Sequence, residues 1–468
     1  MQDYRFSELF EAQKKHFQNH IKSSRPDARI VKLKKIRTWI TTHVQDIRDA
    51  IYEDFRKPSV EVDLTDIRPV LMEIEHALAH IRSWMAPRYV STPLLFFGTR
   101  SKVVYEPKGV CLILAPWNFP FMLSVGPLIS AIAAGNCCIL KPSEMTPQTS
   151  RLIARMIAEL FDPNEVCVVE GDHVAAEALL KLPFHHIFFT GSPAIGKKVM
   201  HAAAEHLSSV TLELGGKNPV IVDETADIED TVSKLLWGKF MNGGQSCMAP
   251  NYVYVHHTIY TAFCEALVAM YARMFGAANE PSPDVASLVS DRHYERIASL
   301  IRTTVAQGAK VLAGNHSDAA RRYVAPTVLG NVTTDHAVMQ DEIFGPILPL
   351  LEYTHRDEVI AYINTQERPL NLYIFSTDMT KADAIIAQTT AGSTCINETT
   401  LNFAHPDLPF GGVNTSGIGK AHGYYGFLAF SNERGILKQR RGLTTMKLVY
   451  PPYTERVKKI VKLVMKYL

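Results

Sequence analysis

Short, wholly apolar runs alternate with longer stretches of helical periodicity over residues 110–206. Strands that are apolar throughout are buried on both faces, and strands joined through helices run parallel to one another. Right-handed crossovers then wind such strands into a doubly wound, Rossmann-like sheet. The alternation therefore predicts an α/β fold with a parallel sheet covered by helices on both faces. The predicted strands are 110–115, 137–140, 166–169 and 186–189, and the predicted helices are 121–134, 148–161, 175–182 and 195–206.

The segments on either side of this unit have other patterns. Residues 3–87 place apolar side chains three and four positions apart with charges between them, which is typical of amphipathic helices. Residues 94–105 mix apolar residues with the turn-forming sequence Gly98-Thr99-Arg100 and predict a hairpin or an extended arm. Further along we predict a strand at 252–255, a helix at 259–275 and helices over 285–302.

Composition limits the kind of protein this can be. A chain of 468 residues is long enough for about two to four domains, and 47% hydrophobic with 21% charged residues is typical of a globular protein. The net charge of +2, without a basic stripe carrying interleaved aromatics in the body of the chain, argues against nucleic acid as a partner.

Seven cysteines include no C-x-x-C pair and no zinc-like spacing, so neither a metal site nor a disulfide framework is expected. Such cysteine usage fits a reducing compartment. The first residues lack the apolar core of a signal peptide, and no apolar run is long enough to span a bilayer. We therefore expect a cytoplasmic protein.

Cys247 stands in the sequence F-M-N-G-G-Q-S-C-M-A-P-N-Y at 240–252. The two glycines allow close backbone approaches, and Pro250 stiffens the chain beyond the thiol. This shape suits a thiol that is exposed to a reactant better than one packed in the core. A cysteine taken alone is more often a small buried hydrophobe. We favour a nucleophile because of a second segment, T-L-E-L-G-G-K-N-P at 211–219, which contains Glu213.

Glu213 lies between apolar residues at an expected strand end, before a glycine turn. Burial of a carboxyl group without a cation raises its pKa toward neutrality, as a general base requires. A solvated charge at a strand edge is the alternative.

The pair E-L-G-G-K-N-P and G-Q-S-C resembles the signature of the NAD(P)-dependent aldehyde dehydrogenase superfamily. The resemblance continues through F-T-G-S with Gly196, D-E-I-F-G-P at 341–346 and L-P-F-G-G-V-N-T-S-G-I-G-K-A-H-G at 408–423, and it covers the chain to about residue 440. The last segment, W-N-F-P and the short N-terminus resemble the class 3 branch, which handles fatty and aromatic aldehydes. Asn251, where an acid is expected, and N-T-S-G at 414–417 depart from the pattern.

A predicted strand leads into T-G-S-P-A-I-G, where Gly191, Ser192 and Gly196 open a helix. The free amides and the dipole of that helix end favour a pyrophosphate, although a tight turn without a ligand has the same pattern. The resemblance implies that Lys141 and Glu144 hold the adenosine ribose. A carboxylate at Glu144 accepts a hydrogen bond from the 2′-hydroxyl and repels a 2′-phosphate, which favours NAD while NADP stays open.

The resemblance assigns the remaining site residues as well. Asn118 would donate its amide to the developing oxyanion, although an asparagine before an aromatic and a proline is often only a turn residue. Trp117 would line the cofactor side. Glu342 and Phe344 would position the nicotinamide ribose and ring, although an acid and an aromatic beside Gly-Pro also fit a plain loop. The expected substrate-tunnel residues are Phe119, Phe403 and His422.

The implied chemistry is oxidation of an aldehyde to the carboxylic acid. The Cys247 thiolate attacks the carbonyl, hydride passes to NAD and a thioester remains, which water activated by Glu213 hydrolyses. A coenzyme A-acylating or semialdehyde dehydrogenase of the same fold is the alternative, although Glu213 argues against acyl transfer to coenzyme A. A non-enzymatic relative would have lost Cys247 or Glu213.

The predicted domains are a coenzyme-binding domain (1–85 and 106–212), a catalytic α/β domain (213–404) and an oligomerisation or bridging region (86–105 and 405–450). In the family that the chain resembles, such an arm mediates dimer contact, so the resemblance implies a homodimer. Residues 451–468 form a basic amphipathic tail that predicts either peripheral membrane contact or a helix docked on the subunit or its dimer mate.

Overall fold

The structure is a computed structural model that describes residues 2–93, 96–276, 281–442 and 444–467. It contains the predicted parallel sheet: six strands in the order β17-β7-β6-β3-β4-β5, all parallel except β17. These strands are β3 (Val110–Leu114), β4 (Cys137–Lys141), β5 (Val166–Val168), β6 (His186–Gly191), β7 (Ser209–Leu214) and β17 (Gly417–Ile418). The predicted α/β, Rossmann-like class is confirmed.

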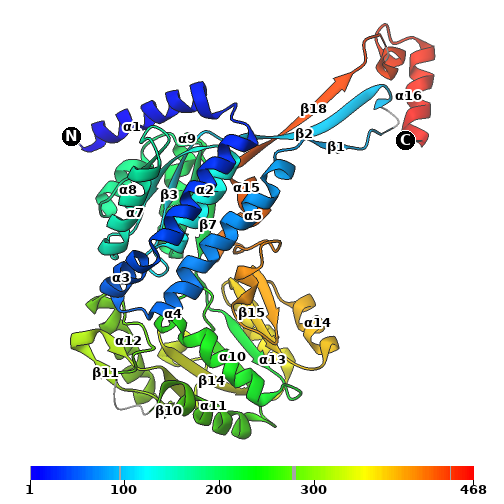
Figure 1. Ribbon diagram of the computed structural model, residues 1–468. Helices are drawn as coiled ribbons and strands as arrows, with labels where there is room; N and C mark the ends of the chain where they lie inside the picture. The colour runs from blue at the N-terminus through cyan, green and yellow to red at the C-terminus, as the bar shows by residue number, and fades with distance from the viewer. Residues whose placement is uncertain (1, 94–95, 277–280, 443, 468) are drawn as a thin grey trace.

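Helices cover both faces of this sheet (Figure 1). One face packs against α1 (Gln2–His16), α8 (His173–Leu180) and α9 (Pro193–His206). The other packs against α6 (Met122–Ala134) and α7 (Pro147–Leu160), with a further layer of α2 (Pro26–Thr42), α3 (Val44–Phe55) and α5 (Arg68–Trp84) outside them. Between α3 and α5 lie α4 (Ser59–Val62) and a helical turn, η2 (Asp63–Ile67).

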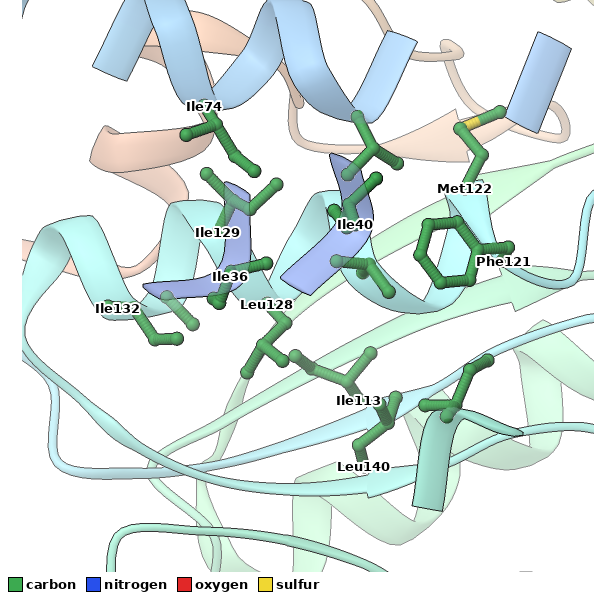
Figure 2. Packing of buried hydrophobic residues seen from close by; sticks show 14 of the residues in the cluster. Ile36, Ile40, Ile74, Ile113, Phe121, Met122, Leu128, Ile129, Ile132 and Leu140 are labelled. Carbon is green, nitrogen blue, oxygen red and sulfur yellow. The ribbon is translucent and has the colours of Figure 1, made fainter. Parts of the chain in front are cut away.

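Helix α6 lies at the centre of the larger core. Figure 2 shows Leu128, Ile129 and Ile132 of α6 between side chains of α2 and α5 on one side and of the sheet on the other. The neighbours labelled there are Ile36, Ile40, Ile74, Ile113 and Leu140, and all are fully buried. This packing fixes the position of α6 and of the loop that precedes it.

A second sheet has seven strands in the order β10-β13-β14-β9-β8-β15-β16, parallel except at β10. The strands are β8 (Pro219–Val222), β9 (Tyr252–His256), β10 (Lys310–Ala313), β13 (Thr327–Gly330), β14 (Ile347–Tyr353), β15 (Asn371–Phe375) and β16 (Ser393–Ile396). Helices α10 (Ile228–Phe240) and α11 (Tyr260–Phe275) cover one face. Helices α12 (Asp291–Ala306), α13 (Arg356–Thr365) and α14 (Met379–Gln388) cover the other, and β11 (Ser317–Asp318) pairs with β12 (Tyr323–Val324) beside them.

The helix predicted over 285–302 begins only at Asp291, so the prediction was wrong for its first six residues. The backbone amides there bond elsewhere: Ser287 donates to Phe55, Leu288 to Arg322, and Val289 to the side-chain oxygen of Gln245. These bonds hold the segment in an irregular conformation. The Ser290 side chain then caps the helix by accepting from the His293 amide.

An antiparallel arm extends from the body (Figure 1). It consists of β1 (Arg88–Val90), β2 (Thr99–Pro107) and β18 (Ser431–Gln439), in the order β1-β2-β18. Residues 94–95 of the predicted arm lie outside the described residues. Helix α15 (Gly423–Ala429) precedes β18, while the turn η8 (Thr445–Val449) and helix α16 (Glu455–Tyr467) lie at the far tip.

Strand β7 continues past the predicted domain boundary at residue 212, and the boundaries themselves stay a prediction.

A buried ion pair joins the helical layer to α6. Lys57 Nζ lies 2.7 Å from Asp66 Oδ2 with both side chains fully buried, and the Met122 amide donates to Asp66 Oδ1 over 3.3 Å. We predict that Asp66→Ala lowers the free energy of unfolding by about 3–5 kcal/mol, because it leaves a buried ammonium without its counter-charge.

The measurement is thermal and urea unfolding of the variant. The control is the double variant Lys57→Met/Asp66→Leu, which removes both charges and should recover much of the lost stability. A single variant as stable as the original protein would contradict the importance of this pair.

Candidate active site

Cys247 follows a strained turn after α10. Within η4 (Met241–Gly244), Asn242 and Gly243 have φ values of 58° and 60°, and Gly244 has 69°. A side chain at Gly244 would also collide with the carbonyl oxygen of Gly345. Two reasons therefore favour glycine here: the positive φ and the lack of room for a Cβ atom. The turn directs Cys247 into a cavity of about 130 Å³ rather than into the core.

The cavity wall is mostly apolar. It brings together Cys247, Glu213, Phe119, Phe403 and His422, which the sequence analysis had selected from distant segments. Leu64 and Leu401, about half exposed, also line it. A thiol and a carboxyl group therefore share one largely apolar pocket.

Glu213 is the penultimate residue of strand β7 and is buried, with 7% of its surface exposed. Within the described residues neither of its carboxylate oxygens has a hydrogen-bond partner. Burial raises the pKa of Glu213 well above its usual value, and the nearby Lys420 ammonium opposes this only in part. Such a group can accept a proton near neutral pH.

Burial also controls the thiol. It raises the pKa of Cys247 to about 12, and the carboxylates of Glu342 and Glu213 add to the effect. Without a cofactor, the group is therefore a thiol rather than a thiolate at neutral pH.

Asn118 lies between β3 and α6 and is buried. Its side-chain Nδ2 donates to the carbonyl of Gln245 over 3.1 Å, two residues before Cys247. Asn242 donates to the backbone oxygens of both Asn118 and Gln245, at 2.8 and 3.1 Å. These bonds fix the amide beside the thiol loop. Sequence reasoning missed Asn242, although an asparagine before two glycines is a signal of positive φ.

The predicted ribose and pyrophosphate residues lie at the carboxyl ends of the parallel strands. Lys141 ends β4, and its Nζ lies 3.1 Å from Glu144 Oε2. Gly191 ends β6, and Ser192 caps α9 by accepting from the amide of Ile195. This edge is where doubly wound sheets bind nucleotides.

Gly196 lies in the first turn of α9, where a Cβ atom would lie 2.8 Å from Leu214 Cδ2. The glycine lets the helix pack closely on β7. The predicted ribose and pyrophosphate residues do not line the Cys247 cavity; these are Lys141, Glu144, Gly191, Ser192 and Gly196.

Trp117 and Phe344 form an edge-to-face pair with centroids 5.4 Å apart. Beside them Glu342 is half-buried, and its Oε1 accepts from the Gly216 amide over 3.2 Å. Burial raises the pKa of Glu342 to about 7, against the attraction of Arg296 and Lys239. These groups form a second wall near the thiol, since the Glu342 charge also acts on Cys247.

Asn251, a departure from the family pattern, supports that wall. Its Oδ1 accepts from the Ile343 amide over 2.9 Å, so it holds the D-E-I-F-G-P loop. Its Nδ2 is buried without a partner among the described residues. The acceptor needed for the loop is therefore kept despite the change from acid to amide.

His422 lies in the wall of the cavity and has a φ of 68°. Its ring packs edge-to-face on Phe403, 4.6 Å between centroids, and its Nδ1 lies 3.6 Å from Glu73 Oε2. Glu73 also accepts from the Gly423 amide over 2.8 Å. Sequence analysis did not select Glu73, because nothing in its helical segment distinguishes it from a solvated charge.

Comparison with known proteins agrees with this geometry. Residues 4–436 match the Aldehyde dehydrogenase family. The chain is 44% identical to the 4,4′-diaponeurosporen-aldehyde dehydrogenase of Staphylococcus aureus, over 92% of each chain. It is 38% identical to Aldehyde dehydrogenase family 3 member B1 of Rattus norvegicus, over 92% of this chain and 91% of that one.

Solved structures give the same result. A substrate-bound state of Staphylococcus aureus AldH superposes with a TM-score of 0.93 at 41% identity, covering 98% of this chain and 99% of that one. PnpE in complex with nicotinamide adenine dinucleotide superposes with a TM-score of 0.85 at 27% identity, over 94% and 91% of the two chains.

A Rossmann-like sheet beside a second α/β unit is the architecture that this chain shares with solved oxidoreductases, one of them in complex with nicotinamide adenine dinucleotide. The chain belongs to the aldehyde dehydrogenase family. Its relatives include family 3 members, which confirms the predicted class 3-like branch.

We predict that alkylation of Cys247 by iodoacetamide in cofactor-free protein accelerates about tenfold per pH unit between about pH 7 and 9, because the thiolate fraction grows by that factor below the pKa. Mass spectrometry of the Cys247 peptide gives the rate separately from the other cysteines. In Glu213→Gln the pKa of Cys247 should fall, because one repelling negative charge is removed, and alkylation should be faster at each pH. A rate that levels off below pH 8 would contradict a raised thiol pKa.

Proposed function

We propose that this aldehyde dehydrogenase oxidises apolar aldehydes, of medium or long aliphatic chain or aromatic, with NAD as the preferred cofactor. The observation that carries the proposal is the cavity that holds Cys247 and the unpaired Glu213 inside a mainly apolar wall. Its volume of about 130 Å³ is close to the ~150 Å³ of an engineered cavity that admits benzene.

The Cys247 thiol first loses its proton to solvent water, which the positive charge of a bound nicotinamide ring would favour, and the thiolate sulfur then adds to the aldehyde carbonyl. The Asn118 amide, which has a second N–H beyond the one given to Gln245, and the Cys247 backbone N–H stabilise the oxyanion. The bound cofactor supplies the hydride acceptor. Loss of hydride from the former carbonyl carbon leaves a thioester on Cys247.

Glu213 then takes a proton from a water molecule, which attacks the thioester and releases the carboxylic acid and the thiol. The raised pKa of Glu213 suits this step, and its oxygens are free to bind the water. Covalent catalysis thus divides the oxidation into acylation and deacylation.

The cofactor residues fit a dinucleotide by their chemistry. Lys141 and Glu144 would bind the adenosine ribose, and Gly191, Ser192 and Gly196 leave the first turn of α9 open to a pyrophosphate. The Glu144 carboxylate disfavours a 2′-phosphate, which supports NAD over NADP.

Trp117, Glu342 and Phe344 would hold the nicotinamide riboside near the thiol. The support is their grouping near Cys247, with the half-buried Glu342 held by the Gly216 amide.

The alternatives receive less support. A semialdehyde carries an anionic end that a lysine or arginine would bind, and the cavity wall has neither among its described residues. A coenzyme A-acylating enzyme must protect its thioester from water, whereas the unpaired oxygens and raised pKa of Glu213 favour activation of water.

The test is pre-steady-state kinetics of NADH formation with hexanal and benzaldehyde. We predict that Glu213→Gln gives a burst of about one NADH per subunit and then turnover about 10²–10⁴-fold slower, because general-base catalysis contributes that factor. Cys247→Ala should form no NADH while still binding the cofactor. Parallel runs with NADP measure the cofactor preference, and normal steady-state turnover in Glu213→Gln would assign the base elsewhere.

We also propose a cytoplasmic homodimer formed through the arm. Strand β18 pairs with β2 on one side, and its other edge has no partner strand among the described residues. Such an edge is a template for pairing with a second chain. The seven cysteines are free thiols, which supports a reducing compartment.

The arm tip supports peripheral membrane contact in addition. Residues 437–468 carry nine lysines or arginines and one acidic residue, so the rest of this chain of net charge +2 carries a net charge of −6. Exposed apolar side chains share the tip with these cations: Phe97, Leu448, Tyr453, Val461, Leu463 and Met465. Helix α16 packs on η8 and lies far from the body (Figure 1). None of the described helices is long and apolar enough to cross a bilayer.

We predict that the full chain co-sediments with vesicles containing phosphatidylserine but not with phosphatidylcholine alone, and that salt weakens the binding, because cations near an anionic surface contribute about 1 kcal/mol each. Removal of residues 451–468 should abolish the co-sedimentation.

Light scattering of the truncated protein is the control and should still give a dimer. Equal vesicle binding by both proteins would contradict a membrane-binding tail. A truncated protein that becomes monomeric would assign the tail to the dimer contact instead.

A further inference from the structure

Helix α6 has two differently used faces. One carries Leu128, Ile129 and Ile132 into the core, as Figure 2 shows. The other lines the Cys247 cavity with Met122, Leu123, Gly126, Pro127 and Ser130, at the three- and four-residue spacing of one helical stripe. Gly126 lies in the middle of this stripe.

Gly126 and Pro127 are poor helix residues in the interior of a helix. Glycine loses more backbone entropy on folding than alanine, and proline removes the N–H that would bond to the carbonyl of Leu123. A buried glycine in such a place needs a packing or functional reason.

Crowding is not that reason. A Cβ atom at Gly126 would find no atom within 4 Å, whereas one at Gly196 would lie 2.8 Å from Leu214 Cδ2 and one at Gly426 would collide with Ser130 Oγ. Among the buried glycines of the described residues, Gly126 alone faces open space in this way. The missing side chain keeps a space empty instead of admitting a neighbour.

That space belongs to the cavity that contains the thiol. From Met122 to Ser130, α6 runs along it for about 12 Å at the ordinary helical rise. Leu64 and Pro69 belong to the same wall, and near Ser130 the helix meets α15 at Gly426. A linear apolar tail extending from a carbonyl at Cys247 would run past Gly126.

We propose that Gly126 sets how much of an aldehyde's apolar tail the cavity accepts, which makes it a specificity-determining residue. This inference rests on the proposed function. A larger side chain at this position projects into the space along α6, so it excludes long tails while the thiol, Glu213 and the cofactor residues keep their places.

The experiment compares kcat/KM for decanal and propanal in the original protein and in Gly126→Ala, Gly126→Val and Gly126→Leu. Each buried methylene is worth about a fourfold factor, so exclusion of about four methylenes should lower the decanal-to-propanal ratio by about 100-fold or more in Gly126→Leu. Gly126→Ala is the matched control: it removes the glycine flexibility but adds one methyl group to open space, so its ratio should change less than about fourfold.

Melting temperatures show whether each variant is folded, and if Gly126→Leu is not, Gly126→Val carries the test with an intermediate fall in the ratio. An unchanged ratio in a folded Leu or Val variant overturns the role of Gly126. Equal loss for both aldehydes overturns it too, because the residue then controls the site and not the tail. An original protein that oxidises neither aldehyde overturns the proposed function instead.

Discussion

A carboxyl group buried without a hydrogen-bond partner is costly in a folded protein, and the cavity beside Cys247 contains one, Glu213. The positive charge of Lys420 lowers the pKa of Glu213. Its ammonium, however, donates to the backbone carbonyls of Gly411 and Gly412 and forms no ion pair with the carboxylate. The ammonium therefore acts on Glu213 only through space. A direct ion pair would lower the carboxyl pKa and weaken the group as a proton acceptor. The surrounding fold must hold this unfavourable arrangement in place.

The thiol loop is held by a network that reaches across both sheets. Gln245 accepts from the Asn118 and Asn242 side chains through its backbone oxygen, and its own amide donates to the carbonyls of Asn242 and Ser287. Its Oε1 accepts from Val289. The segment that failed to form the predicted helix therefore holds Gln245 and, through it, the loop that carries Cys247. Local helical propensity at 285–290 gives way to hydrogen bonds that position Cys247.

The alternation of apolar strands and helices was enough to predict the doubly wound sheet, because burial on both faces leaves an unmistakable sequence pattern. The individual motifs also placed Cys247 and Glu213 on shaped backbone. The contacts that tune them were out of reach. Lys420 and Glu73 act on residues far away in the chain, and each looks like an ordinary polar residue in its own segment. Asn242 stands before two glycines, which signals positive φ but not its bond to Asn118. Only the folded chain shows which distant side chains they face.

Helix α6 shows how core and cavity constrain one element together. A propensity argument would break it at Gly126-Pro127, yet it continues to Ala134 because Leu128, Ile129 and Ile132 are fully or almost fully buried against α2, α5 and the sheet. Tertiary packing thus overrides the local preference. Burial of the core face stabilises α6. The opposite face can therefore carry Gly126 and Pro127, which are unfavourable in a helix but leave space in the cavity. A wall supported in this way stays in place when the cavity is empty, so the substrate meets a preformed site.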